Sequence, residues 1–298
     1  MTTNKPQKLR QLLKMKKSLL MPVAHDALTA KLIAQASFEA FSIGGFGLAA
    51  SHFGLPDIGV LTQGDFQPSI KNILASSALP ALVDGDTGYG NGESIKRLVR
   101  EYEALGAAAI FIEDQVWPKR CGHTGVKEIV AAEEMAEKIK AAVEAKTNPD
   151  FLIMARTDAR SALGSVEAAI ERARVYLKAG AEAIFIEAPR TIEEIKIIPQ
   201  ALPGTILLIN MMEGGQTPLC SQKDLGKWGY KLIAYPISSL LTMVKAISET
   251  LEYLKIHGTT NDYFVRNMAS FEELKNLLNF DQISVPNPQT KTRRKEKR

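Results

Sequence analysis

Cysteine is scarce in this chain, and long apolar runs are missing from it. Only two cysteines, Cys121 and Cys220, occur in 298 residues, which is too few for a disulfide framework. No apolar run approaches the roughly 18 residues that a membrane-spanning helix requires. The apolar patch at residues 19–24 runs straight into His25 without a cleavage site of small residues, so it does not resemble a signal peptide. These absences predict a cytoplasmic protein with no membrane association.

Acidic residues are absent from the first 25 positions, which carry six lysines and arginines. The last eight residues, KTRRKEKR, carry six more against a single glutamate. The formal net charge of +4 therefore comes from the two ends, and the body of the chain between them is acidic. We interpret the ends as solvated segments rather than nucleic-acid contacts. A lysine-rich organelle transit segment stays open for the N-terminus.

Short apolar runs alternate with amphipathic segments along the body of the chain. Eight runs have the composition of strands buried on both faces. They cover residues 19–24, 40–43, 81–84, 109–113, 151–156, 183–187, 205–210 and 231–235. Helix-period segments at 94–105, 132–145, 166–179 and 192–202 lie between them, with Gly106, Gly180 and Gly204 as helix ends. Eight β-then-α units predict an α/β fold of the (β/α)8 (TIM) barrel type, which typically takes about 250 residues. An open doubly wound sheet is disfavoured because no GxGxxG follows the first strand.

The expected domain organisation follows from this pattern. The catalytic barrel, with an N-terminal helix, is expected over residues 1–260. Further helices are predicted at 238–254 and 270–278. Residues 261–282 then form a C-terminal helical extension, and residues 283–298 form a basic flexible tail.

Charged residues stand where the predicted strands end, which in a barrel is the mouth that carries catalysis. The third strand ends at Asp84 with Asp86 two residues on, and the fourth ends at Glu113. Side chains two apart on an extended chain share a face, so Asp84 and Asp86 should point the same way. An all-oxygen ligand set suits Mg²⁺ better than zinc. An Asx-type turn made by the same aspartates is the alternative.

The loop EDQVWPKRCGH, residues 113–123, collects reactive side chains after a buried strand. Lys119, Arg120 and His123 flank Cys121, and nearby cations favour a thiolate, which predicts a thiol pKa closer to neutral. A cysteine can also serve as a small buried hydrophobe. The density of charge in this loop indicates a catalytic segment.

Six ordered motifs resemble the isocitrate lyase/phosphoenolpyruvate mutase superfamily. They are LPD at 55–57, DGDTGYGN at 84–91, EDQ-x3-KRCGH at 113–123, MARTDAR at 154–160, IEAP at 186–189 and NMMEGGQTP at 210–218. The similarity runs from about residue 8 to about residue 260. Within the superfamily the chain is similar to 2-methylisocitrate lyases and to 2-alkylmalate lyases.

The resemblance implies a barrel whose last helix is exchanged between subunits, in a homotetramer built as a dimer of dimers. It implies Mg²⁺, for which Mn²⁺ can substitute, held near Asp84, Asp86 and Glu113 with Asp57 nearby. It further implies roles for residues that match the family's motifs. The catalytic set is Cys121, Arg156, His123, Lys119 and Glu187, and the substrate-binding set is Gly44, Gly45, Phe46, Arg120, Gly122, Asn210, Glu213, Thr217 and Pro218.

The implied reaction is carbon–carbon cleavage of a 2-hydroxy di- or tricarboxylate, either 2-methylisocitrate or a 2-alkylmalate. A 2-oxo acid such as pyruvate leaves, together with a carboxylate such as succinate. Cys121, carried on a closing loop, protonates the carbanion-like enediolate.

Three positions depart from the pattern of relatives. Gly44 stands where they commonly carry serine, which removes one hydroxyl contact of about 1 kcal/mol. Thr124-Gly125 and Glu213-Gly214-Gly215 replace the Arg-Pro and Glu-Phe-Gly that are usual in 2-methylisocitrate lyases. The change at Gly44 bears on substrate affinity, whereas the other two differences favour an alkylmalate-type lyase, and Thr124 is predicted to bear on substrate choice.

Three other interpretations remain. A phosphonomutase of the carboxyvinyl-carboxyphosphonate phosphorylmutase type would use the same Mg²⁺ site, although the simple phosphoenolpyruvate mutase lacks the cysteine. Oxaloacetate acetylhydrolases have a similar loop but usually depart from proline at the position of Pro218. A non-catalytic barrel is disfavoured because the charged positions of the site are filled.

Overall fold

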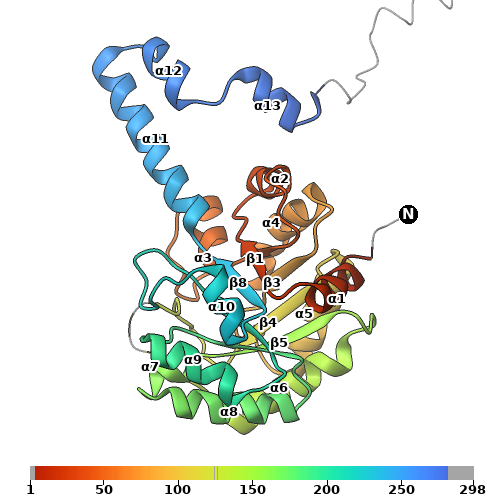
Figure 1. The fold of residues 1–298 in the computed structure, drawn as a ribbon. Helices are drawn as coiled ribbons and strands as arrows, with labels where there is room; N and C mark the ends of the chain where they lie inside the picture. The colour runs from red at the N-terminus through yellow and green to blue at the C-terminus, as the bar shows by residue number, and fades with distance from the viewer. Residues whose placement is uncertain (1–3, 124, 126, 281–298) are drawn as a thin grey trace, which may run out of the picture. The chain divides into compact units, whose positions relative to one another are not determined.

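Eight parallel strands form one sheet in the computed structural model, which describes residues 4–123, 125 and 127–280. The strands are β1 Leu19–Pro22, β2 Phe41–Ile43, β3 Ala81–Asp84, β4 Ala109–Glu113, β5 Leu152–Thr157, β6 Ala183–Ile186, β7 Ile206–Asn210 and β8 Leu232–Tyr235. From β2 to β8, each strand pairs in parallel with the next in sequence, and β8 pairs with β1. A bridge between Val23 and Ser42 joins β1 to β2 and closes the ring. The predicted (β/α)8 barrel is confirmed, with every strand within two residues of its expected start and end (Figure 1).

Helices lie before, between and after the strands along the chain. They are α1 Lys5–Met15, α2 Ala27–Gln35, α3 Gly45–Leu48, the π-helix η1 Ala49–Phe53, α4 Gln63–Ser76, α5 Gly92–Ala104, α6 Ala132–Ala145, α7 Ala159–Ala162, α8 Val166–Lys178, α9 Ile192–Ala201, α10 Gln222–Trp228, α11 Ser238–His257, α12 Asn261–Asn267 and α13 Phe271–Leu277. Side-chain caps fix several starts: Ser165 accepts from the N–H of Ala168, and Thr191 from that of Glu194. Gly106 and Gly180 follow α5 and α8 at φ of 90° and 106°, which explains glycine at these helix ends.

The barrel interior is filled by side chains rather than open. One buried cluster joins large residues of the strands, among them Met21, Phe111 and Phe185, to the leucines of α1. Leu9, Leu12 and Leu13 of α1 belong to this cluster, so α1 packs on the apolar interior of the barrel. Because the interior is apolar, the charged residues that follow the strands collect at the strands' C-terminal ends.

The chain divides into two compact units between Met243 and Val244. The second unit contains most of α11 together with α12 and α13. Its helices expose many large apolar side chains, including Ile247, Leu251 and Phe271. No helix among the described residues is long and apolar enough to cross a membrane. The domain boundary at residue 260 stays a prediction, and the expected tail at 283–298 lies outside the described residues.

Candidate active site

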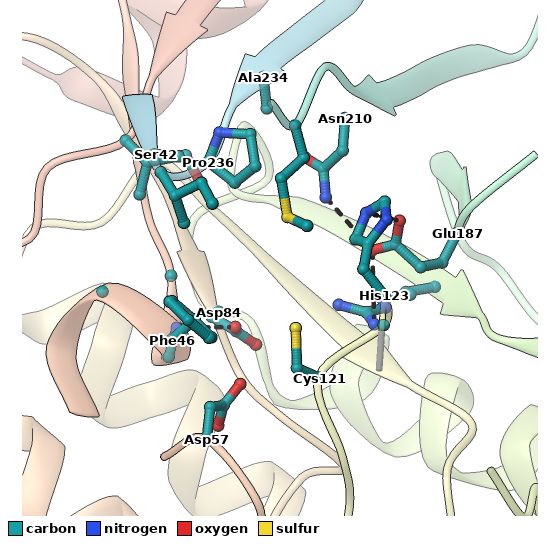
Figure 2. Close-up of a pocket in the computed structure, with 18 of the residues that line it drawn as sticks. Ser42, Phe46, Asp57, Asp84, Cys121, His123, Glu187, Asn210, Ala234 and Pro236 are labelled. Atoms are coloured by element: carbon teal, nitrogen blue, oxygen red, sulfur yellow. Dashed lines mark hydrogen bonds and ion pairs between the residues drawn. The ribbon is translucent and has the colours of Figure 1, made fainter. Parts of the chain in front are cut away.

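A cavity of about 70 Å³ opens at the C-terminal ends of the strands. Most of the residues singled out from the sequence line it: Gly44, Gly45, Phe46, Asp57, Asp84, Lys119, Arg120, Cys121, Gly122, His123, Arg156, Glu187 and Asn210. Figure 2 shows the thiol of Cys121 pointing into this pocket, with Asp57, Asp84 and Phe46 on one side and His123, Glu187 and Asn210 on the other. The structure therefore brings together residues that lie far apart in the sequence.

Four carboxylates gather on one side of the pocket around a single ammonium group. We call Asp57, Asp84, Asp86 and Glu113 the acidic cluster. The Nζ atom of Lys119 lies 2.6 Å from Oδ1 of Asp57 and 2.6 Å from Oδ1 of Asp86. Burial alone would lower the pKa of Lys119, but the surrounding carboxylates outweigh it and raise that pKa well above its usual value. Lys119 therefore stays charged and holds the loop that follows β4 to the barrel.

The turn after β3 differs from the expected extended geometry. The backbone N–H of Asp86 donates to Oδ1 of Asp84 at 2.9 Å, and Asp86 itself has φ of 47°. The expectation that both carboxylates share a face through strand alternation was therefore wrong, because the chain turns after Asp84 in an Asx-type turn. Tyr89, which the sequence argument passed over inside its DGDTGYGN motif, donates from its hydroxyl to Oδ2 of Asp86.

The acidic cluster carries more negative charge than its neighbours balance. Burial raises the pKa of Asp84 to about 6, with the charge of Asp86 adding to the effect. Burial likewise raises the pKa of Asp57 and moves that of Glu113 well above its usual value. The Oε1 atom of Glu113 is buried without a hydrogen-bond donor among the described residues.

A divalent cation fits this donor set in charge and in chemistry. The cluster offers only oxygen ligands, which hard cations such as Mg²⁺ prefer. Within the described part of the chain, no group of three or more of its His, Cys, Asp and Glu side chains is arranged to hold a metal directly.

The opposite side of the pocket is organised by Arg156 at the end of β5. We call Arg156, Asp158, Glu187 and His123 the paired cluster. Arg156 donates from Nε and Nη2 to the two carboxylate oxygens of Asp158 at 2.9 and 3.0 Å. Its Nη2 lies 3.4 Å from Oε2 of Glu187, and Nε2 of His123 lies 3.1 Å from Oε1 of Glu187. Burial would raise the pKa of Glu187, but Arg156 and His123 outweigh burial and lower it to about 2.

The paired cluster rests on a second buried carboxylate. Asp114 accepts from the backbone N–H of Asp158 at 2.9 Å and from the hydroxyl of Thr157 at 2.7 Å. The hydroxyl of Tyr176 on α8 donates to Asp114 as well, at 2.7 Å. The sequence marks Asp114 and Asp158 as polar residues at strand ends but assigns them no role. In the structure they orient Arg156, as supporting residues commonly do around a functional group.

Residues 116–123, 125, 127 and 128 belong to the loop between β4 and α6, which we call the lid loop. A bridge between Gln115 and Ile129 and a hydrogen bond from Val116 N–H to the carbonyl of Glu128, at 2.9 Å, close its base. The side-chain amide of Gln115 accepts from the N–H of Arg120 and donates to its carbonyl, both at 2.9 Å. The lid loop is thus held in shape by its own residues.

The thiol of Cys121 behaves differently from the sequence-based prediction. Burial is the largest influence on it and raises its pKa above the usual value. The prediction of a lowered pKa was therefore wrong, because Lys119 turns toward Asp57 and Asp86, and His123 toward Glu187. Cys121 keeps its proton at neutral pH, which suits an acid better than a nucleophile.

Gly122 allows the lid loop to lie directly on the paired cluster. A Cβ atom at this position would stand 2.5 Å from Cγ of Glu187 and 2.6 Å from Nη2 of Arg156. The lid loop also meets the loop that follows β7, where the N–H of Gln216 donates to Nδ1 of His123 at 3.1 Å. Glycine at position 122 is therefore required by the closeness of this contact.

The remaining predicted site residues lie partly in the cavity and partly outside it. The N–H of Gly45 donates to Oδ2 of Asp84 at 3.0 Å. Asp86, Glu113, Glu213, Thr217 and Pro218 do not line the cavity. Glu213 accepts from the hydroxyl of Ser238 at 2.6 Å, and the buried hydroxyl of Thr217 has no partner among the described residues. Thr124 lies outside the described residues.

A buried arginine and a lid-borne thiol facing an oxygen-rich acidic cluster at a barrel mouth define an enzyme site of the (β/α)8 class. The family described as phosphoenolpyruvate phosphomutase matches residues 9–255. The chain belongs to this phosphoenolpyruvate mutase/isocitrate lyase superfamily.

Three curated relatives of this chain are named for different activities within the superfamily. It is 44% identical to 2,3-dimethylmalate lyase of Eubacterium barkeri, over 94% of this chain and 96% of that protein. It is 42% identical to the chloroplastic carboxyvinyl-carboxyphosphonate phosphorylmutase of Arabidopsis thaliana, over 88% and 78%. It is 38% identical to 2-methylisocitrate lyase of Halalkalibacterium halodurans, over 93% and 90%. Two of these three relatives are named as lyases.

Solved structures give the same picture. Crystalline 2,3-dimethylmalate lyase matches with a TM-score of 0.87 at 33% identity, over 95% of this chain and 93% of that one. Oxaloacetate acetylhydrolase with 3,3-difluorooxalacetate matches at 0.86 and 31%, over 94% and 95%. Phosphonopyruvate hydrolase in complex with oxalate and Mg²⁺ matches at 0.85 and 29%, over 95% and 97%.

Proposed function

We propose that this enzyme is a carbon–carbon lyase that cleaves a 2-hydroxy di- or tricarboxylate, either 2-methylisocitrate or a 2-alkylmalate. The products are a 2-oxo acid such as pyruvate and a carboxylate such as succinate. The observation that carries the proposal is the thiol of Cys121, which points from the lid loop into the pocket that Arg156 also lines. Burial raises the pKa of this thiol, which agrees with the role of an acid. Cleavage to a carbanion needs an acid above the reacting carbon, and a phosphoryl transfer does not.

The chain's own residues divide the work of this reaction. A general base takes the 2-hydroxyl proton and leaves an oxyanion. The bond between carbons 2 and 3 then breaks as carbon 2 becomes the carbonyl of the 2-oxo acid. The electron pair remains on carbon 3 as a carboxylate enediolate, to which Cys121 gives its proton. Arg156 faces the oxyanion with a permanent positive charge, held by Asp158 and Glu187. Lys119 and Gly122 keep the lid loop against the barrel, which excludes water from the carbanion.

We propose Mg²⁺ as the cofactor, near Asp84, Asp86 and Glu113 with Asp57 close by. When bound, it would polarise the oxygens of the 2-oxo acid part of the substrate. Excess EDTA should abolish activity, and added Mg²⁺ should restore it. Full turnover in the presence of excess chelator would refute this part of the proposal.

The substrate assignment is tested by direct turnover. The purified protein with Mg²⁺ is offered 2-methylisocitrate, 2,3-dimethylmalate, oxaloacetate and phosphonopyruvate, and pyruvate release is coupled to lactate dehydrogenase. The hydrolysis of oxaloacetate is followed separately through oxalate. We expect turnover of a carbon–carbon substrate, with an alkylmalate preferred. Turnover of phosphonopyruvate alone, or of none of the four, would sink the lyase assignment.

We also propose a homotetramer of helix-exchanged dimers as the working assembly. Supporting it, α11 exposes Val244, Ile247 and Leu251 by more than half of their surface, and Leu240 is its buried residue. A helix with such an apolar surface is typical of a protein–protein contact. Light scattering coupled to gel filtration should give a tetramer for the native chain and smaller species for an Ile247→Glu, Leu251→Glu variant. A native monomer would contradict the proposal.

A further inference from the structure

The catalytic pocket has a charged half and an uncharged half, which come from opposite arcs of the barrel. The charged lining residues are Asp84 on β3, Arg156 on β5 and others in the segments that follow β2, β4 and β6. The strands β7, β8, β1 and β2 lie next to one another. Among the described residues, these four strands contribute no charged side chain to the pocket. The substrate therefore meets an uncharged surface on this arc.

Six residues of this arc line the pocket, and we call their surface the apolar wall. They are Val23, Ser42, Leu208, Ala234, Pro236 and Ile237. The hydroxyl of Ser42 donates to the carbonyl of Leu82 at 2.9 Å, so the polar group of this residue is already occupied within the barrel. Asn210, which ends β7, donates from its amide to Oε2 of Glu187 at 3.2 Å. The apolar wall thus offers the substrate hydrocarbon contacts.

The cations that line the pocket belong to its charged half. Lys119 contacts two aspartates of the acidic cluster, while His123 and Arg156 contact carboxylates of the paired cluster. Arg120 follows β4 and lies on the same half. On the other arc, the segment after β7 carries a carboxylate, Glu213, whose Oε2 atom is buried. A substrate carboxylate that faced the apolar wall would leave water without a counter-charge, which is strongly unfavourable.

The direction of the Cys121 thiol decides which part of the substrate meets the apolar wall. Figure 2 shows this thiol pointing toward the end of the pocket where Ser42, Ala234 and Pro236 lie. In the proposed reaction, Arg156 faces the oxyanion on carbon 2, and Cys121 gives its proton to carbon 3. Carbon 3 must therefore lie within reach of the thiol, and its substituent extends toward the apolar wall. This placement rests on the proposed function.

We propose that the apolar wall receives the substituent on carbon 3 of the substrate, and that this substituent is a short alkyl group limited in size by Ala234. The substrate is then a dicarboxylate, a 2-alkylmalate with a further alkyl group on carbon 3, rather than a tricarboxylate. When the bond between carbons 2 and 3 breaks, the 2-hydroxyl proton goes to the general base and the proton of Cys121 goes to carbon 3. The second product is therefore an alkyl monocarboxylate instead of succinate.

Ala234 limits the size of the substituent because of its place in the apolar wall. It lies on β8, where it pairs with Met21 of β1 and with Asn210 of β7. Its side chain is a single methyl group that lines the pocket. The backbone at this position is fixed by the pairing on both sides, so a longer side chain would occupy the room that the alkyl group needs. Ala234 is thus the specificity-determining residue of this arc.

The first test compares two substrates that differ only in the group on carbon 3. 2,3-Dimethylmalate carries a methyl group there, and 2-methylisocitrate carries a carboxymethyl group. With Mg²⁺ and the native protein, kcat/KM for 2,3-dimethylmalate should exceed that for 2-methylisocitrate by about a hundredfold or more, because the extra carboxylate faces the apolar wall. Equal values, or a preference for the tricarboxylate, would overturn the inference.

Binding to the Cys121→Ala variant separates this inference from the proposed function. The variant should cleave too slowly to disturb a calorimetric titration with Mg²⁺ and either compound. 2,3-Dimethylmalate should bind with a Kd at least about tenfold lower than that of 2-methylisocitrate. This result together with no turnover by the native protein would refute the lyase activity and leave the apolar wall in place. Equal affinities, or no binding of 2,3-dimethylmalate, would overturn the inference.

The role of Ala234 is tested by enlarging it. Ala234→Leu should lower kcat/KM for 2,3-dimethylmalate by about tenfold or more and change that for 2-methylmalate, which has no substituent on carbon 3, by less than about twofold. Calorimetric binding of pyruvate should be unchanged, which shows that the variant is folded; Ala234→Val takes its place if leucine lowers the Tm. Ala104→Leu, on the exposed face of α5, is the matched control and should behave like the native protein. An equal loss for both substrates would overturn the role of Ala234.

Discussion

The two sides of the catalytic pocket bury charge in opposite ways. In the paired cluster, Arg156 contacts Asp158 and Glu187, and the pKa of Glu187 falls to about 2. In the acidic cluster, Lys119 contacts Asp57 and Asp86, Arg156 reaches Glu113 at 3.2 Å, and the pKa of Asp84 rises to about 6. The cations of the paired cluster match its carboxylates, whereas the acidic cluster holds more carboxylates than cations. In the proposed function, the first side receives the substrate's anionic groups and the second receives the metal.

Removing the thiol of Cys121, which lies between the two sides of the pocket, should have the largest effect on activity. Cys121→Ala is expected to lower kcat by about 10²–10⁴-fold, the usual contribution of a positioned acid. Binding of a 2-oxo acid should survive, because both clusters remain. Steady-state kinetics and calorimetric titration with pyruvate measure the two quantities. Cys220→Ala, the matched control outside the pocket, should keep native kcat; a native kcat in Cys121→Ala would remove the assigned role.

Neutralising one carboxylate on each side should shift stability in opposite directions. In protein freed of metal, Asp84→Asn should raise the free energy of unfolding and Glu187→Gln should lower it, each by about 1–3 kcal/mol at pH 7. Relief of repulsion is the cause in the first case and loss of attraction in the second. Urea unfolding measures both. The exposed Glu144→Gln is the control and should stay within about 0.5 kcal/mol; a loss of stability in both site variants would contradict the comparison.

The stability that Glu187 contributes to the paired cluster should depend on pH in the acid range. Because the pKa of Glu187 is lower in the folded protein than its usual 4.5, its stabilising contribution is full above that value. It is lost as the pH falls from 4.5 toward about 2. The difference in Tm between the native protein and Glu187→Gln should therefore shrink over this range. A difference that stays constant down to pH 3 would mean that the carboxylate is not held as described.

The smallest expected effect concerns the departure at Gly44. Its backbone is extended, at φ of −117°, and a Cβ atom there would meet only Cγ1 of Val23, at 3.6 Å. Gly44→Ser should fit and add one hydroxyl to the pocket, which lowers KM by up to about fivefold with little change in kcat. Gly44→Ala is the control that adds the carbon without the hydroxyl. Equal KM values for the two variants would show that the hydroxyl finds no partner.

Much of the barrel and of its mouth could be predicted from the sequence. Apolar runs with charged residues behind them locate strands and the open ends of strands, which is why Asp84, Glu113 and Arg156 were found. The direction in which a long side chain turns could not be predicted. Lys119 and His123 are sequence neighbours of Cys121 but pair with Asp57 and Glu187 in the fold. For that reason the predicted pKa shift of Cys121 had the wrong sign.

Contacts between residues far apart in the sequence could not be predicted either, because they leave no local sequence pattern. The support of Arg156 by Asp114 depends on side chains from β4, β5 and α8 meeting in space. The burial of the Lys127 ammonium without a hydrogen-bond acceptor among the described residues likewise depends on tertiary packing. Neither is visible as periodicity or spacing, because both arise from tertiary packing rather than from the local chain.

The fit of Gly122 against Glu187 and Arg156 has a further consequence. Any side chain at this position would act as a wedge, because its first carbon would overlap Cγ of Glu187. A wedged lid loop would leave the thiol of Cys121 out of place while the two clusters stay intact. Solvent would then compete to protonate the enediolate, from either face. In the proposed reaction, the absence of one methyl group at this position thus determines which acid delivers the proton and to which face of the enediolate, although a product such as succinate is itself achiral.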